Sequence, residues 1–189
     1  MSKIFIISAP SGAGKSSLLN AFLETPLGKS KFSVAVSHTT RTPRPGETHG
    51  KEYYFTTISD FESLLDDNVF LEYAKVFKNY YGTSIKEIDT ILAAGKNIIL
   101  EIDWQGAQQT RAIYKDKATS LFIMPPSLDE LRHRLVSRNT DSDDVIEYRM
   151  TQAKDEISHL NEYEDNIVND DFEIALQELS NYFEKNINN

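Results

Sequence analysis

A Gly-rich turn lies between an apolar run and a helical pattern near the start of the chain. The turn is Ser8-Ala-Pro-Ser-Gly-Ala-Gly-Lys-Ser-Ser17, and it follows the apolar run Ile4-Phe-Ile-Ile7. The apolar residues after it, through Leu23, are spaced as on one face of a helix. A strand, a Gly-rich turn and a helix that opens on Gly-Lys-Ser are the context of a phosphate-binding P-loop. Ala9 stands where the usual pattern has its first glycine, a mild departure because alanine is also small.

The chemistry of this turn suits a nucleoside triphosphate. Gly12 and Gly14 allow a tight bend in which successive N–H groups point at one anion. The N-terminus of the following helix adds partial positive charge. We expect Lys15 to reach the β- and γ-phosphates of ATP and the Ser16 hydroxyl to ligate Mg²⁺. The alternative is a Gly-rich strand–helix turn that carries an incidental lysine.

Composition limits the classes of protein to which the chain can belong. Its 189 residues suit one domain, and 40% hydrophobic residues can form a real core. With 20 basic and 29 acidic residues the net charge is −9, which argues against broad nucleic-acid binding. No apolar run is long enough for a membrane helix, there are no cysteines, and Met1 leads almost directly into the first strand. We therefore expect a cytoplasmic protein with no membrane partner; the oligomeric state, a homo-oligomer included, stays open.

Apolar strands that alternate with helical patterns predict an α/β fold with a parallel sheet covered on both faces. Ligands of such sheets bind at the carboxyl ends of the strands. The segment from about residue 33 to residue 81 breaks the alternation and predicts a mainly β insertion. Within it we expect a capping box at Ser59 and a turn at Asn79-Tyr-Tyr-Gly-Thr83. Further capping boxes at Ser84 and Ser127 predict helices, the second running to about Arg138.

The insertion carries candidate acceptor-binding residues. Arg41 and Arg44 lie in a Pro-rich loop with Glu47, and two arginines in a stiff loop can clamp a phosphate. A solvated polar loop is the equal alternative. Glu72 could accept hydrogen bonds from a donor pair such as guanine N1–H and its 2-amino group, with Tyr81 and Thr83 facing the same cleft. Taken alone, Glu72 fits an exposed strand position better.

Two further groups of charged residues could act on phosphates. Glu101 and Asp103 follow an apolar strand, where alternation places both on one face and where acids can hold Mg²⁺ directly or through water. Arg134 and Arg138 are four residues apart on one predicted helix, and Arg149 follows. Such arginines could close over a transferring phosphoryl group. A solvated basic helix face is the more ordinary interpretation.

Together these stretches resemble the guanylate kinase family over nearly the whole chain. The P-loop is shared with many folds, whereas Ser37-His-Thr-Thr-Arg-Thr-Pro-Arg-Pro-Gly-Glu47 is far more specific. The other matching stretches are Tyr53-Tyr-Phe55, Phe70-Leu-Glu-Tyr-Ala74, Tyr81-Gly-Thr83, Ile102-Asp-Trp-Gln-Gly106, and Arg134-Leu-Val-Ser-Arg138 with Arg149.

The resemblance implies Mg²⁺-dependent transfer of the ATP γ-phosphoryl group to GMP or dGMP. It implies a P-loop core (residues 1–33, 86–125 and 151–189), a GMP-binding subdomain (34–85) and a helical lid (126–150). ATP would contact Ser11, Gly12, Ala13, Gly14, Lys15, Ser16 and Ser17, and Mg²⁺ would contact Ser16, with Asp103 through water. GMP would contact Ser37, Arg41, Arg44, Glu47, Tyr53, Glu72, Tyr81, Thr83, Glu101 and Asp103. The catalytic set would be Lys15, Arg41, Arg134, Arg138 and Arg149.

One departure and two rival interpretations remain. The family commonly has Asp-Ile-Asp where this chain has Glu101-Ile-Asp103, which leaves the role of position 101 open. A related kinase with another acceptor would not need Ser37, Glu72 and Thr83. A guanylate kinase-like binding module without activity could dispense with the P-loop lysine and the lid arginines, which this chain keeps.

Overall fold

The computed structural model describes residues 2–137 and 142–188, and its centre is a parallel five-stranded sheet. The strand order is β2-β7-β1-β8-β9, and every neighbouring pair is parallel. The α/β class and the parallel sheet that the sequence predicts are therefore confirmed. The strands are β1 (Ile4–Ser8), β2 (Phe32–Val34), β7 (Asn97–Glu101), β8 (Ala118–Met124) and β9 (Asp165–Val168).

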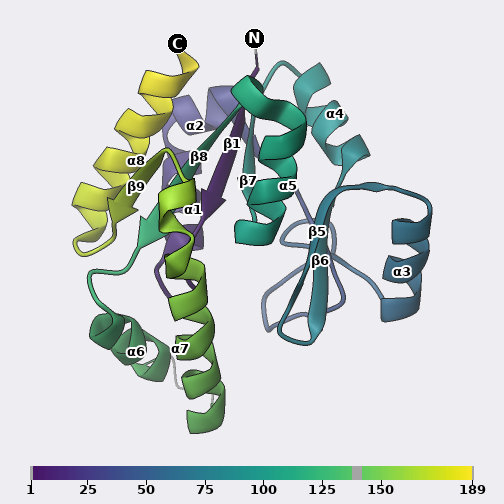
Figure 1. The fold of residues 1–189 in the computed structure, drawn as a ribbon. Helices are drawn as coiled ribbons and strands as arrows, with labels where there is room; N and C mark the ends of the chain where they lie inside the picture. The colour runs from purple at the N-terminus through teal and green to yellow at the C-terminus, as the bar shows by residue number, and fades with distance from the viewer. Residues whose placement is uncertain (1, 138–141, 189) are drawn as a thin grey trace.

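Strand alternation divides the core into two layers. Phe5 and Ile7 of β1 face α1 (Lys15–Glu24) and α8 (Phe172–Ile187), where the Phe22 and Phe183 rings stack 4.3 Å apart. Ile4 and Ile6 face the opposite layer, which contains α4 (Ile85–Ala93) and α5 (Trp104–Tyr114). Figure 1 shows α8 on one side of the sheet and α4 and α5 on the other. Two covered faces explain why the strands are almost uniformly apolar.

A second, four-stranded sheet forms the predicted mainly β insertion. Its order is β4-β3-β6-β5, and α3 (Ile58–Asp66) lies beside it in Figure 1. The strands are β3 (His38–Thr39), β4 (Tyr54–Phe55), β5 (Phe70–Val76) and β6 (Asn79–Ser84). Phe61 of α3 stacks on Phe70 and Tyr80, with ring centroids 4.5 and 5.3 Å away, and so fixes the helix to this sheet.

Two local predictions in the insertion are wrong. Residues 79–83 form most of β6 rather than a turn, and the chain reverses instead at Phe77 and Lys78. Gly82 lies within β6. A glycine is needed there for packing, because a Cβ would come within 3.1 Å of the Phe61 and Phe70 rings. The cap of α3 is Thr57, whose hydroxyl accepts from the Asp60 N–H, rather than Ser59.

The remaining helices complete the chain. They are α2 (Pro26–Lys31), α6 (Leu128–Ser137), α7 (Asp143–Ser158) and the 3₁₀ helices η1 (Lys115–Lys117) and η2 (Leu160–Glu162). The predicted caps at Ser84 and Ser127 are confirmed, because their hydroxyls accept from the N–H groups of Glu87 and Glu130. Of the helices that the structure describes, none is long and apolar enough to cross a membrane.

Candidate active site

The Gly-rich turn lies at the carboxyl end of the central strand. β1 ends at Ser8 and α1 begins at Lys15, whose ammonium lies 3.5 Å from the Ile7 carbonyl. Gly12 and Gly14 have φ values of 102° and 92°, which side-chain-bearing residues rarely adopt. The backbone therefore curls round the N-terminus of α1, as a phosphate-binding loop requires.

Close packing is a second reason for these two glycines. A Cβ at Gly12 would lie 3.0 Å from Leu131 and 3.1 Å from Leu135, so α6 packs directly on the loop. A Cβ at Gly14 would lie 2.3 Å from the side-chain nitrogen of Asn169. That nitrogen donates to the Ala13 carbonyl at 2.7 Å. Asn169 is thus a structural part of the loop that sequence reasoning missed; its only signal is a polar residue directly after β9.

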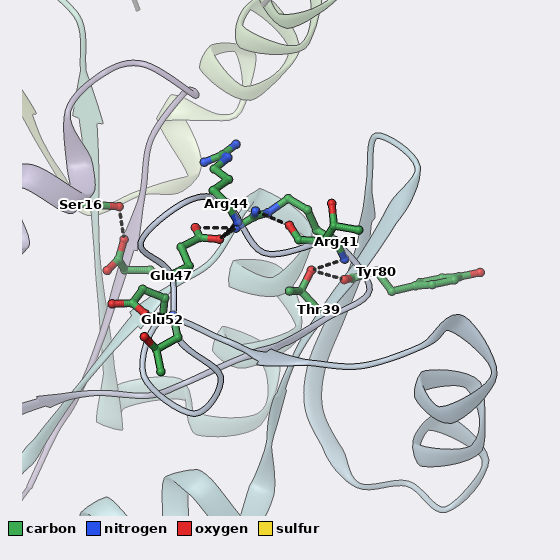
Figure 2. A network of polar contacts seen from close by, with 10 residues as sticks. Ser16, Thr39, Arg41, Arg44, Glu47, Glu52 and Tyr80 are labelled. Atoms are coloured by element: carbon green, nitrogen blue, oxygen red, sulfur yellow. Dashed lines mark hydrogen bonds and ion pairs between the residues drawn. The ribbon is translucent and has the colours of Figure 1, made fainter. Parts of the chain in front are cut away.

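The two acids that follow Leu100, Glu101 and Asp103, contact different parts of the structure. Glu101 accepts a hydrogen bond from the Ser16 hydroxyl at 2.9 Å, the dashed line at Ser16 in Figure 2. Its carboxylate also lies 4.0 Å from the Lys15 ammonium. Asp103 lies beyond the end of β7 and caps α5 by accepting from the Gly106 N–H at 2.9 Å. Burial raises the pKa of Asp103, while Gly106, Gln105 and Lys15 act against that rise. Strand alternation therefore does not govern this pair, and Glu101 is the acid in contact with Ser16.

A buried carboxylate, that of Glu72 on β5, lies between the second sheet and α5. Glu72 is 3% exposed and is paired in register with Thr83, whose hydroxyl lies 2.9 Å from that of Ser37. A Cβ at Gly106 would come within 2.4 Å of the Glu72 carboxylate, so the glycine admits the acid. Burial, aided by Asp103 and opposed by Thr83, raises the pKa of Glu72 to about 7. Among the described residues, one Glu72 oxygen has no hydrogen-bond partner.

The arginine loop forms a network at the other end of this sheet. Arg41 donates to both carboxylate oxygens of Glu47, at 2.7 and 2.9 Å, and the Arg44 N–H also donates to Glu47 (Figure 2). Burial opposes ionisation of Glu47, but these hydrogen bonds outweigh it and lower its pKa. The buried Thr39 fixes the loop by accepting from the Arg41 N–H and donating to the Tyr80 carbonyl. Both arginines are thus arranged around one carboxylate.

Two tyrosines line the same network. The Arg41 guanidinium lies 5.4 Å from the centre of the Tyr53 ring, and Tyr81 packs edge-on against Tyr53 with centroids 5.9 Å apart. Burial raises the pKa of Tyr53 to about 12, and the next largest cause is the charge of Glu101. The charge of Glu101, the acid that contacts Ser16, thus acts on Tyr53 beside the arginine network.

Two of the predicted lid arginines have different hydrogen-bond partners in the structure. Arg149 of α7 donates to the Ser11 hydroxyl at 2.8 Å, so the structure brings it to the P-loop. Arg134 donates to Glu130 on its own helix at 2.9 Å. Arg138 lies outside the described residues.

Glu156 is a charged residue near the P-loop that sequence analysis did not single out. It lies on α7 about two turns after Arg149, on the same face of the helix. Burial raises the pKa of Glu156 to about 7 and outweighs the Ser11 N–H, which lowers that pKa. Lys15 lowers that pKa, whereas Asp103 raises it. A helix-borne glutamate among other surface acids gives no sequence signal that it lies here. Glu156 and Arg149 together tie α7 to the P-loop.

The structure combines a parallel α/β core, a P-loop at the end of its central strand, and an arginine of α7 that contacts this loop. These features define a P-loop phosphotransferase. Comparison with known proteins narrows this class. The family model described as guanylate kinase matches residues 1–186. The chain belongs to the guanylate kinase family.

Individual relatives agree with this assignment. A guanylate kinase of Francisella tularensis subsp. holarctica (strain LVS) is 67% identical over 184 residues, which cover 97% of both chains. One from Haemophilus influenzae (strain 86-028NP) is 55% identical over 177 residues, covering 93% of this chain and 84% of the relative. The crystal structure of guanylate kinase from Anaplasma phagocytophilum superposes with a TM-score of 0.81 at 34% identity, covering 98% of this chain and 86% of that one.

A more distant match shows the fold alone. Shikimate kinase from Bacteroides thetaiotaomicron has a TM-score of 0.52 at 14% identity, covering 96% of this chain and 98% of that one. The fold of the core is therefore also found in this shikimate kinase.

Proposed function

We propose that this kinase transfers the γ-phosphoryl group of Mg²⁺-bound ATP to GMP, and to dGMP, giving ADP and GDP for guanine nucleotide synthesis and recycling. The observation that carries the acceptor assignment is the buried Glu72, with one carboxylate oxygen unpartnered among the described residues. Guanine offers two adjacent donors, N1–H and the 2-amino group, which a carboxylate can accept together. Ser37 and Thr83 complete the base-reading set beside Glu72.

The donor site is the P-loop. Backbone N–H groups and the N-terminus of α1 would bind the ATP phosphates, with Lys15 on the β- and γ-phosphates. The ATP-binding residues of this proposal are Ser11, Gly12, Ala13, Gly14, Lys15, Ser16 and Ser17.

The residues beside α1 fit a magnesium ion. Mg²⁺ prefers oxygen ligands and is usually held by one or two carboxylates together with substrate phosphates. The Ser16 hydroxyl and the Glu101 carboxylate lie 2.9 Å apart and supply such oxygens, and Asp103 would act through water. When bound, the ion would neutralise charge on the transferring phosphoryl group. The longer side chain of Glu101, relative to the family's usual aspartate, keeps its contact with Ser16.

The acceptor phosphate would bind at the arginine network. Arg41 and Arg44 would exchange part of their contact with Glu47 for the phosphate, with Tyr53 and Tyr81 beside it. Lys15, Arg41 and Arg149, with Arg134 and Arg138 from the lid, would stabilise the charge that develops in transfer. In this proposal residues 34–85 act as the acceptor subdomain, 126–150 as the lid, and the rest as the core. Its compartment is the cytoplasm, and with a net charge of −9 its partners are nucleotides rather than nucleic acid.

Replacing Glu72 tests the base-reading role. Glu72→Gln turns one acceptor oxygen into a donor, and Glu72→Ala removes both acceptors. We expect the KM for GMP to rise about tenfold to 100-fold, while the KM for ATP stays near the wild-type value, because a lost buried hydrogen-bond partner costs about 1–3 kcal/mol. Glu62→Gln, an exposed position on α3, is the matched control. An unchanged KM for GMP in both Glu72 variants would contradict the assignment.

A further inference from the structure

The tip of the β5–β6 hairpin carries a residue in an unfavourable backbone conformation. Val76 pairs with Asn79, which leaves Phe77 and Lys78 as a two-residue turn. Phe77 has a φ of 57°, in the left-handed region where glycine or asparagine is usual and a bulky side chain is an outlier. Strain of this kind persists only where surrounding contacts hold it, and it concentrates at functional sites.

The Phe77 ring contacts α7 of the lid segment. Phe77 packs on Tyr148 of α7 with centroids 5.0 Å apart and planes at 56°. The neighbouring Arg149 guanidinium lies 5.8 Å from the Phe77 ring centre, within the range of a cation–π contact. Figure 1 shows the hairpin and α7 on the same side of the molecule, beyond the carboxyl ends of the main strands. The hairpin tip is thus a direct contact between the acceptor sheet and the lid helix.

The same arginine also contacts the donor site. Arg149 donates to the Ser11 hydroxyl of the P-loop at 2.8 Å while it lies against Phe77. One guanidinium therefore contacts three parts of the molecule: the lid that carries it, the P-loop, and the acceptor sheet through Phe77. A group with this placement responds both to ATP at the loop and to any movement of the hairpin.

We propose that Phe77 is a positioning residue for the phosphoryl transfer, which holds Arg149 at the P-loop when the acceptor sheet is in place and so couples GMP binding to ATP binding. This inference rests on the proposed function. Phe77 touches neither nucleotide in this account; it acts through Arg149. The left-handed turn is the geometry that aims the ring at α7, and this explains why the chain keeps a phenylalanine where glycine would be easier.

The test compares three variants of the full chain. Phe77→Gly removes the ring and relieves the backbone strain, so the hairpin should still fold, with a melting temperature no more than a few degrees below wild type. Phe77→Tyr keeps the ring. Lys78→Ala, the exposed neighbour in the same turn, is the matched control. Calorimetric titration measures the Kd of a non-hydrolysable ATP analogue with Mg²⁺, with and without saturating GMP, and steady-state kinetics supply kcat and KM.

In wild type, Phe77→Tyr and Lys78→Ala, we expect GMP to tighten analogue binding about fivefold or more. In Phe77→Gly that ratio should fall to about one, and kcat should fall about tenfold, while the Kd for GMP alone stays within about twofold. A Phe77→Gly protein with wild-type coupling and kcat overturns the inference, as does equal loss in Phe77→Tyr or Lys78→Ala. Wild type that turns over GMP without coupling also overturns it. Wild type that neither binds nor phosphorylates GMP refutes the proposed function instead.

Discussion

At the scale of single residues, Glu72 is an acid that the fold keeps out of water. Glu72 is 3% exposed, the charge of Asp103 acts on it, and burial raises its pKa from 4.5 to about 7. A binding site that must accept two donors from a base gains from an acceptor that is already desolvated, because less solvent has to be displaced when the base arrives. Burial of the ionised Glu72 carboxylate should lower the free energy of unfolding.

The stability of the unliganded protein should therefore fall as pH rises through the range between those two pKa values. Below about pH 4.5 Glu72 is protonated in both the folded and the unfolded state. Between about pH 4.5 and 7 the unfolded chain releases its proton, whereas the folded protein holds it, so the unfolding free energy decreases. From about pH 5 to about pH 8 we expect wild type to lose about 2 kcal/mol more than Glu72→Gln in urea unfolding. Parallel pH curves for the two proteins would contradict the raised pKa.

A second acid, the partly buried Glu156, affects the same pH range. Glu156 also has its pKa raised to about 7, mainly by burial, and contributes a similar slope to both. Subtracting the Glu72→Gln curve removes the part of the Glu156 contribution that is common to both proteins.

At the scale of elements, the P-loop is defined by its neighbours as well as by its own residues. Gly14 is constrained by its φ of 92° and by the Asn169 side chain, and Gly12 by the leucines of α6. Gly95, at the end of α4, has a φ of 72° but open space around its Cα. A comparison of Gly95 with Gly14 therefore separates the cost of backbone strain from the cost of a steric clash with a neighbouring side chain.

Alanine at these two glycines should have unequal effects. Gly95→Ala should cost about 1–2 kcal/mol of unfolding free energy, from backbone strain alone. Gly14→Ala should cost more, because its Cβ displaces Asn169, and it should raise the KM for ATP about tenfold or more. Urea unfolding and ATP kinetics measure both effects. If Gly14→Ala were no more harmful than Gly95→Ala, the packing of Asn169 would not constrain the loop.

Elements also show where prediction from sequence works. The P-loop and the caps at Ser84 and Ser127 depend on residues within a few positions of one another, so the local sequence pattern is enough to predict them. The hairpin turn was misplaced because Asn79 and Gly82 are turn formers, while the true turn uses a phenylalanine. Gly82 serves packing against Phe61 and Phe70, which only the folded sheet reveals.

At the scale of the whole molecule, the site is assembled from residues far apart in sequence. Local pattern predicted the arginine loop, the acids after Leu100 and the lid helices. It could not predict that Asn169 would hold the Ala13 carbonyl or that Glu156 would reach Ser11, because each depends on how separate elements pack. The resemblance to a known family supplied what local pattern lacks, namely which distant residues act on one ligand.

The most direct test of the account is a coupled ADP-release assay of the wild-type protein with ATP and Mg²⁺. GMP, dGMP, AMP, CMP, UMP and ribose phosphates are offered as separate acceptors. The account predicts turnover confined to GMP and dGMP, because only guanine presents the donor pair that Glu72 accepts. Equal turnover with AMP or with a ribose phosphate would contradict the base-reading pocket, and a folded protein that binds ATP but phosphorylates no acceptor would contradict the enzyme itself.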